Sequence, residues 1–155
     1  MIKKSFITDQ LTMDFEKALS IISKKGFEYI EIHSLWNKTI ADLNYEEIKK
    51  AKKLIHKYNL KVSCLSSTLF LMCPLFKDVD SLGNFSDKFL TYKGDYEKHV
   101  EGLKKCIEYS QILDTDFIRI FSFKRESGVS PKYENIIEKM AELLIEPSLI
   151  AQKNK

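Results

Sequence analysis

Glu31 and His33 are the residues whose spacing most directly suggests chemistry. They lie two apart in the run from Phe27 to His33, which is rich in strand-forming residues, so both side chains project from one face of a strand. A Glu-x-His pair could provide two ligands to a metal ion, although two ligands alone make a weak site. The alternative is a polar, hydrogen-bonded lining with a structural role only.

Four further residues could line a substrate site. Arg119, in a second strand-like run, could bind a substrate hydroxyl or phosphate or serve a structural ion pair. Trp36 could stack on the apolar face of a ring-shaped substrate or pack against a neighbouring loop. Ser66 and Ser122 stand at predicted strand ends and could donate hydrogen bonds, although serine is common in turns.

The composition is that of one ordinary globular domain. The 155 residues are 44% apolar and 30% charged, which excludes intrinsic disorder. The net charge of +3 comes from interspersed charges, so a nucleic-acid partner is not expected. Because the chain has no apolar run of membrane-spanning length and no signal-like start, we expect a cytoplasmic protein with no membrane partner.

Several common cofactor sites are disfavoured. Cys64, Cys73 and Cys106 are widely spaced and odd in number, which indicates a reducing compartment, and no Cys-x-x-Cys pair suggests structural zinc. No glycine-rich loop follows the first predicted strand, so a dinucleotide or flavin site is also disfavoured.

Strand-like and helix-like patterns alternate along the chain. Asn44 with Glu47 predicts a capping box at the start of one helix, and Pro147 is expected to interrupt or end the last helix. His56 and His99 fall on helices and are expected to face solvent. The predicted strands are residues 3–8, 27–33, 60–66 and 116–123; the predicted helices are residues 12–25, 44–58, 95–113 and one beginning at 130–131.

This βαβαβαβα order predicts an α/β fold with a parallel sheet and right-handed crossovers. Two architectures fit: a (β/α)4 unit equal to half of a (β/α)8 barrel, and a compact doubly wound sheet with helices on both faces. The connection from about residue 67 to 94 is long, and its run Leu69–Phe76 is wholly apolar. We expect that run to form a lid over the pocket or a subunit contact.

The chain resembles the N-terminal half of the sugar phosphate isomerase/epimerase family, the xylose isomerase-like TIM barrels. The similar segments, in order, are Ser5-Phe6-Ile7-Thr8-Asp9, Gly26-Phe27-Glu28-Tyr29-Ile30-Glu31-Ile32, Ser34-Leu35-Trp36-Asn37-Lys38 and Ile118-Arg119-Ile120-Phe121-Ser122-Phe123. The resemblance covers essentially all of residues 1–155, read as a single half-barrel domain that is truncated relative to the family. His33 departs from the family, where arginine is more often expected.

The resemblance implies an enzyme that isomerises or epimerises a sugar or sugar phosphate. A complete member would use a divalent metal, Mn, Mg, Zn or Co, with ligands on strands five to eight, so this chain is expected to bind no metal and to be inactive alone. Alternatives are phosphodiester cleavage, as in the related endonuclease IV-type enzymes, and a non-catalytic assembly module.

Within such a barrel the second and fourth strands contribute to a common interior layer. We therefore expect Glu31 and Arg119 to form a direct ion pair. A half-barrel would also leave two strand edges and its inner face open, so we expect a homodimer or other self-association.

Overall fold

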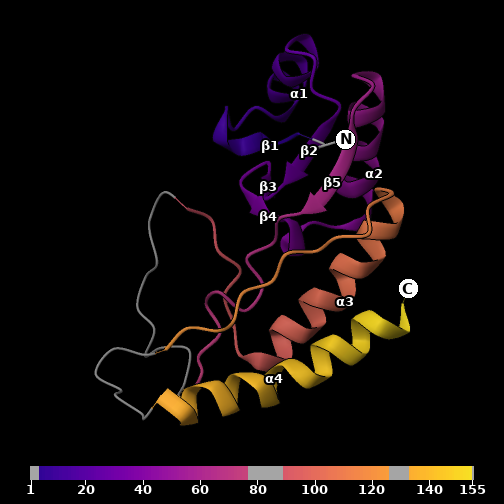
Figure 1. Cartoon of the computed structure of the whole chain (residues 1–155). Coiled ribbons are helices and arrows are strands. Elements are labelled where there is room, and N and C mark those ends of the chain that lie inside the picture. Colours follow the sequence, from indigo (N-terminus) through magenta and orange to yellow (C-terminus); the bar gives the residue numbers. More distant parts are fainter. Residues whose placement is uncertain (1–3, 77–88, 126–132, 155) are drawn as a thin grey trace.

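The computed structural model of the chain describes residues 4–76, 89–125 and 133–154. Short strands alternate with helices, as Figure 1 shows. The elements in chain order are β1 (Ser5–Ile7), the 3-10 helix η1 (Thr8–Gln10), α1 (Phe15–Lys24), β2 (Tyr29–Ile32), β3 (Ser34–Leu35), β4 (Lys38–Thr39), the 3-10 helix η2 (Ile40–Asp42), α2 (Tyr45–Lys57), β5 (Lys61–Leu65), α3 (Tyr96–Ile112) and α4 (Tyr133–Lys153).

The main sheet is parallel and its strands follow the order of the chain. β2 lies between β1 and β5, and Leu65 at the end of β5 forms a parallel bridge to Ile118. The helices contact one another in the same order, α1 on α2, α2 on α3 and α3 on α4. An order that never reverses lacks the switch point of a doubly wound sheet, so the predicted half-barrel is confirmed over the doubly wound alternative.

The hydrophobic core lies between the sheet and the helices. Ile30 and Ile32 of β2 are fully buried there, together with Leu65 of β5 and Leu19 of α1. The alternate residues of β2, Tyr29 and Glu31, are only half-buried because they face the opposite side of the sheet. The predicted direction of the β2 side chains is therefore confirmed.

Side-chain caps set where α1 and α2 begin. The side chain of Asp14 accepts a hydrogen bond from the Lys17 amide, so α1 begins at Phe15 and not near Thr12 as predicted. Asn44 and Glu47 form the predicted capping box, with each side chain bonded to the other's backbone N–H.

The predicted fourth strand is wrong as a regular element. Residues 116–123 make only one isolated bridge, from Ile118 to Leu65, because their backbone pairs first with β5 and then with the irregular segment that follows it. The Arg119 amide donates to the Leu65 carbonyl at 2.9 Å, and the Phe121 amide donates to the Leu69 carbonyl at 2.9 Å. The segment thus holds the fourth position of the half-barrel without strand regularity.

The expected interruption at Pro147 is also wrong, because α4 continues through this proline to Lys153. Proline has no N–H to donate to the carbonyl four residues earlier, which is that of Leu143. The Tyr96 hydroxyl of α3 donates to that Leu143 carbonyl at 3.0 Å instead. A tertiary contact thus replaces the hydrogen bond that the helix loses.

The apolar run after β5 belongs to the core of the chain. Leu69, Phe70 and Cys73 are fully buried, so the expected lid or subunit contact is wrong for most of this run. The Phe70 amide donates to Nδ1 of His99 at 2.9 Å, which places His99 in the interior and contradicts its predicted exposure. His56 is exposed as predicted. Residues 77–88 of the predicted connection, which runs from about residue 67 to 94, lie outside the described residues.

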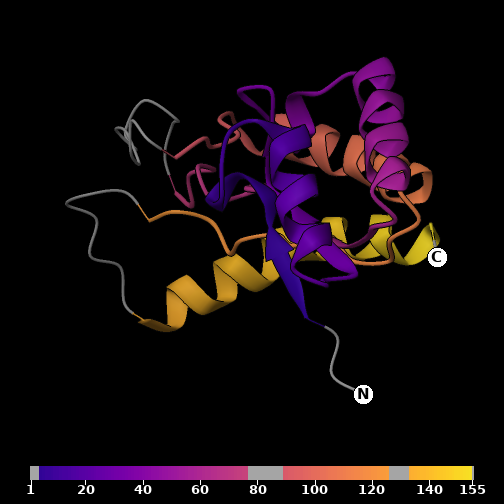
Figure 2. The ribbon, with the colours of Figure 1, turned by 90° about the horizontal axis from the view of Figure 1, so that it is seen from above.

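Two short features were not predicted from the sequence. β3 and β4 pair antiparallel as a small hairpin directly after β2. Figure 2 shows the helices and the strands as seen from above. Among the described residues, no helix combines the length and apolar character needed to cross a membrane.

Candidate functional site

A cavity of about 370 Å³ lies where β1, β2 and the 117–121 segment end. In barrels of parallel strands the carboxyl ends of the strands meet at one face, and that face carries the active site. The cavity is therefore the candidate functional site. Its lining residues are Ile7, Asp9, Gln10, Met13, His33, Ser34, Phe89, Leu90, Arg119 and Phe121.

Asp9 and His33 form the polar centre of this cavity. Asp9 Oδ2 lies 2.6 Å from His33 Nδ1 and also accepts a hydrogen bond from the Ser34 hydroxyl at 2.5 Å. Burial alone would raise the pKa of Asp9, but the hydrogen bonds from His33 and Ser34 and the charge of His33 outweigh it. The pKa of Asp9 is therefore held below its ordinary value, and the carboxylate is ionised at neutral pH.

Both ring nitrogens of His33 face acceptors. Nδ1 meets the ionised Asp9 carboxylate, and Nε2 lies 3.0 Å from the Leu90 carbonyl oxygen. Both nitrogens are thus held by acceptors within the protein. The His33 ring also stacks on Phe89 with centroids 4.6 Å apart. Its nitrogens are therefore engaged by the protein itself and are not turned toward a metal ion.

Arg119 lines the same cavity and is anchored by backbone carbonyls. Its Nη2 donates to the Ser66 carbonyl at 2.7 Å and its Nε to the Ser67 carbonyl at 3.3 Å. The guanidinium carbon lies 5.1 Å from the centre of the Phe121 ring. These contacts use two of its five N–H donors and fix the orientation of the cation at the cavity wall.

The predicted ion pair between Glu31 and Arg119 is wrong. Glu31 Oε2 instead accepts a hydrogen bond from the Ser66 hydroxyl, and Arg119 donates to the backbone carbonyl of the same serine. Glu31 and Ser66 therefore lie beside the cavity in the inner layer of the sheet and do not line it. Ser66 connects the two charged side chains without direct contact between them.

Trp36 and Ser122 do not line the cavity either. Trp36 packs edge-to-face on Phe15 with ring centroids 6.0 Å apart, and Lys50 lies over its ring. Trp36 therefore packs against neighbouring side chains and does not take part in the cavity. Ser122 is exposed beyond the end of the 117–121 segment. Of the six candidate residues, the structure brings His33 and Arg119 together at the cavity.

Several cavity residues were missed from the sequence. Asp9 follows β1 after Thr8, and a charged residue just after a barrel strand is a usable signal of a site residue. Ser34, next to His33, is likewise a polar residue just after a strand, here β2. Phe89 and Leu90 come from the long connection, and nothing local in the sequence links them to His33.

The described residues do not fit a divalent metal. No group of three or more histidine, cysteine, aspartate or glutamate side chains that could hold a metal ion occurs within the described ranges. The carboxylate of Asp9 and the imidazole of His33 are hydrogen-bonded to each other at the cavity, and Glu31 is hydrogen-bonded to Ser66. These side chains therefore offer polar contacts to a substrate but not a metal centre.

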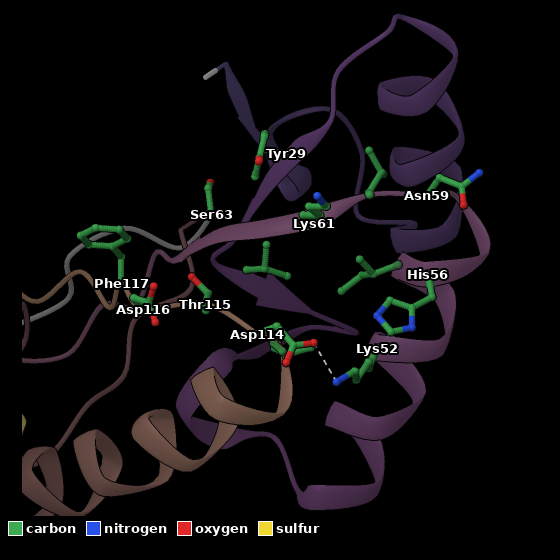
Figure 3. Close-up of a pocket in the computed structure, with 14 residues that line it drawn as sticks. Tyr29, Lys52, His56, Asn59, Lys61, Ser63, Asp114, Thr115, Asp116 and Phe117 are labelled. Carbon is green, nitrogen blue, oxygen red and sulfur yellow. Dashed lines mark hydrogen bonds and ion pairs between the residues drawn. The ribbon is translucent and has the colours of Figure 1, made fainter. Parts of the chain in front are cut away.

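A larger cavity of about 780 Å³ lies at the opposite end of the strands. Figure 3 shows it between the ends of α2 and α3, with Lys52 and Asp114 joined across it by an ion pair of 2.9 Å. It surrounds Tyr29 and Lys61, the first residues of β2 and β5. In barrel folds the amino-terminal face serves stability, so this cavity is not our candidate site.

Two solved structures resemble this chain over nearly all of its length. One, a protein from Sinorhizobium meliloti 1021, has a TM-score of 0.59 and 16% identity over 97% of this chain and 46% of its own. The other, a sugar phosphate isomerase/epimerase from Parabacteroides distasonis, has a TM-score of 0.54 and 18% identity over 98% of this chain and 48% of its own.

The chain has the fold of half of a TIM-type barrel. It spans about half the length of the solved structures it matches, as the resemblance to an N-terminal half predicted. The sequence matches no protein-family model and no curated protein. Because the sequence identities are only 16% and 18%, the similarity to these solved structures concerns the fold alone.

Proposed function

We propose that this chain supplies the substrate-binding half of the active site of a sugar or sugar phosphate isomerase or epimerase. The observation that carries the proposal is the cavity at the carboxyl ends of the strands, which joins Arg119, His33 and Asp9. The fold supports it, since one solved structure with this half-barrel is a sugar phosphate isomerase/epimerase. A sugar phosphate offers the hydroxyl and phosphate oxygens that such donors and acceptors bind.

Each cavity residue has a role in this proposal. Arg119 donates its remaining N–H groups to a phosphate or hydroxyl, while Asp9 accepts from a hydroxyl. Phe121 and Ile7 contact the carbon face of the ring. Because the described residues do not fit a divalent metal, we assign them binding and orientation, and we expect this chain alone to be inactive.

The related phosphodiesterase function has less support. A metal-dependent nuclease of this superfamily, as the resemblance implies, would need several histidines on the barrel face. Of the three histidines in the chain, only His33 lies at a strand end; His56 is exposed on α2 and His99 is buried against Phe70.

Three cysteines without a disulfide also support a reducing, cytoplasmic setting for this enzyme.

The test is a comparison of ligands on the purified chain. Fructose 6-phosphate, fructose and inorganic phosphate are titrated while the backbone amide resonances of Asp9, His33 and Arg119 are followed by NMR. We expect saturable shifts with fructose 6-phosphate, weakened about tenfold or more in Arg119→Lys, since a bidentate charged contact is lost.

The matched control is Lys53→Ala, which removes an exposed cation of α2 far from the cavity. It should bind as the unaltered chain does. Shifts that appear equally with inorganic phosphate alone, or that survive Arg119→Lys unchanged, would contradict the proposed sugar phosphate site.

A further inference from the structure

Ser66, the first residue after β5, uses all of its polar groups in hydrogen bonds, and it is fully buried. Its amide donates to the Ile32 carbonyl of β2 at 2.9 Å, and its hydroxyl donates to Glu31, the neighbour of Ile32. Its carbonyl accepts from Arg119 Nη2 at 2.7 Å. Two successive residues of β2 therefore hold the serine that orients the Arg119 guanidinium.

The chain makes a tight turn at this serine. The Ser67 amide donates to the Leu65 carbonyl at 2.9 Å, which forms a three-residue turn with Ser66 at its centre. The Ser67 carbonyl accepts from Arg119 Nε at 3.3 Å, and the Ser67 hydroxyl donates to the Arg119 carbonyl. The turn thus presents two successive carbonyls to the guanidinium, and Glu31 holds the side chain at its centre.

The orientation of Arg119 matters because this residue lines the cavity at the carboxyl ends of the strands. A guanidinium is planar, so two anchored N–H groups fix the direction of its remaining donors. A buried hydroxyl without an acceptor costs free energy, so removing the Glu31 carboxylate would favour a different position of Ser66. The turn and its two carbonyls would move with that serine.

We propose that Glu31 is a positioning residue for the cavity and acts on a ligand through Ser66 and Arg119. Glu31 is not among the described residues that line the cavity, so it has no contact with a ligand there. It holds Ser66, and the carbonyls of Ser66 and Ser67 aim the guanidinium at an anionic group. The ligand, a sugar phosphate, rests on the proposed function. The contacts between Glu31, Ser66 and Arg119 exist without a ligand and are tested without one.

The first measurement is the Nε–H resonance of Arg119 by NMR in the chain without ligand. The chain has two arginines, Arg119 and Arg125, so Arg125→Lys assigns the signal. In Glu31→Ala we expect this signal to shift and its exchange with water to rise about threefold or more, because the contact with the Ser67 carbonyl loosens. Glu31→Gln keeps an acceptor for the Ser66 hydroxyl, so it should retain the signal of the unaltered chain.

The second measurement is the affinity for fructose 6-phosphate. Glu31→Ala and Ser66→Ala should each weaken binding about three- to tenfold, the change that one lost hydrogen bond produces. The double variant should bind no more weakly than either single variant, because both substitutions remove the same contact. Glu31→Gln should bind as the unaltered chain does.

The matched control is Glu28→Ala, which removes an exposed carboxylate just before β2. It should change neither the Arg119 resonance nor the affinity. Urea unfolding shows whether each variant is folded. Should Glu31→Ala fail to fold, Ser66→Ala still decides, because it removes the same contact and leaves a half-buried Glu31 that water can reach.

Three results would overturn the proposal. The first is an Arg119 resonance that the folded Glu31→Ala and Ser66→Ala variants leave unchanged. The second is equal loss of affinity in Glu31→Gln and Glu31→Ala, since the charge and not the hydrogen bond would then act. The third is additive losses in the double variant. A shifted Arg119 resonance in a chain that does not bind fructose 6-phosphate would support the positioning of Arg119 by Glu31 and contradict the proposed function alone.

Discussion

Mild acid should destabilise this protein through one buried histidine. His99 lies on α3 with no exposed surface, stacked on Phe70 and edge-on to Tyr92. Its Nδ1 accepts a hydrogen bond from the Phe70 amide, so the folded state requires an unprotonated Nδ1. Burial lowers the pKa of His99 from 6.5 to about 4, because a charged ring there would lose its hydration.

The sign and the size of the effect follow from proton linkage. Between pH 6.5 and about pH 4 the unfolded chain binds a proton at His99 and the folded chain does not, so stability falls as the pH falls. The full difference corresponds to about 3 kcal/mol, and about 2 kcal/mol of it is already lost at pH 5. Asp9, whose pKa lies below 3.8, remains ionised at pH 5 and adds little.

The assay is urea unfolding at pH 7 and pH 5, followed by circular dichroism. His99→Gln keeps an acceptor for the Phe70 amide but cannot titrate, so its loss between the two pH values should be about 2 kcal/mol smaller than that of the unaltered chain. His56→Gln, an exposed histidine of α2, should lose as much as the unaltered chain. Equal losses in His99→Gln and the unaltered chain would refute the reasoning.

Three further stability changes should be measurable by urea unfolding. Gly102→Ala places a methyl group 2.8 Å from Leu69 Cδ2, and overpacking should outweigh the better helix propensity by about 1 kcal/mol; a more stable variant would contradict the packing. Asp9→Asn should cost about 2 kcal/mol, because His33 loses its charged acceptor, and the His33 ring nitrogen resonances should move; unchanged resonances would refute the pair. Asn44→Ala should lower the free energy of unfolding by about 1 kcal/mol, because the capping box is lost. An unchanged free energy of unfolding would contradict a stabilising role for this cap.

Local patterns in the sequence were enough to predict much of this fold. The capping box at Asn44 was predictable because its two hydrogen bonds join residues three apart. The alternation of Ile30, Glu31 and Ile32 predicted which side of β2 meets the helices, since strand geometry fixes that direction. His33 and Arg119 were found because both lie in recognisable strand patterns, on residues that turn away from the helices.

Tertiary structure decided what depends on partners distant in the sequence. α4 continues through Pro147 because Tyr96, more than forty residues away, donates to the carbonyl that proline leaves without a donor. His99 is buried because the Phe70 amide in an irregular segment needs an acceptor, and no helical periodicity encodes that need.

The candidate site shows the same division. The sequence determined that polar residues follow the strands, but the partner of His33 is Asp9 after a different strand, 24 residues away. Glu31 bonds to the Ser66 hydroxyl, while the Arg119 guanidinium is oriented by the backbone carbonyls of Ser66 and Ser67. Side-chain pairing of this kind depends on distances between strands, which only the folded chain sets.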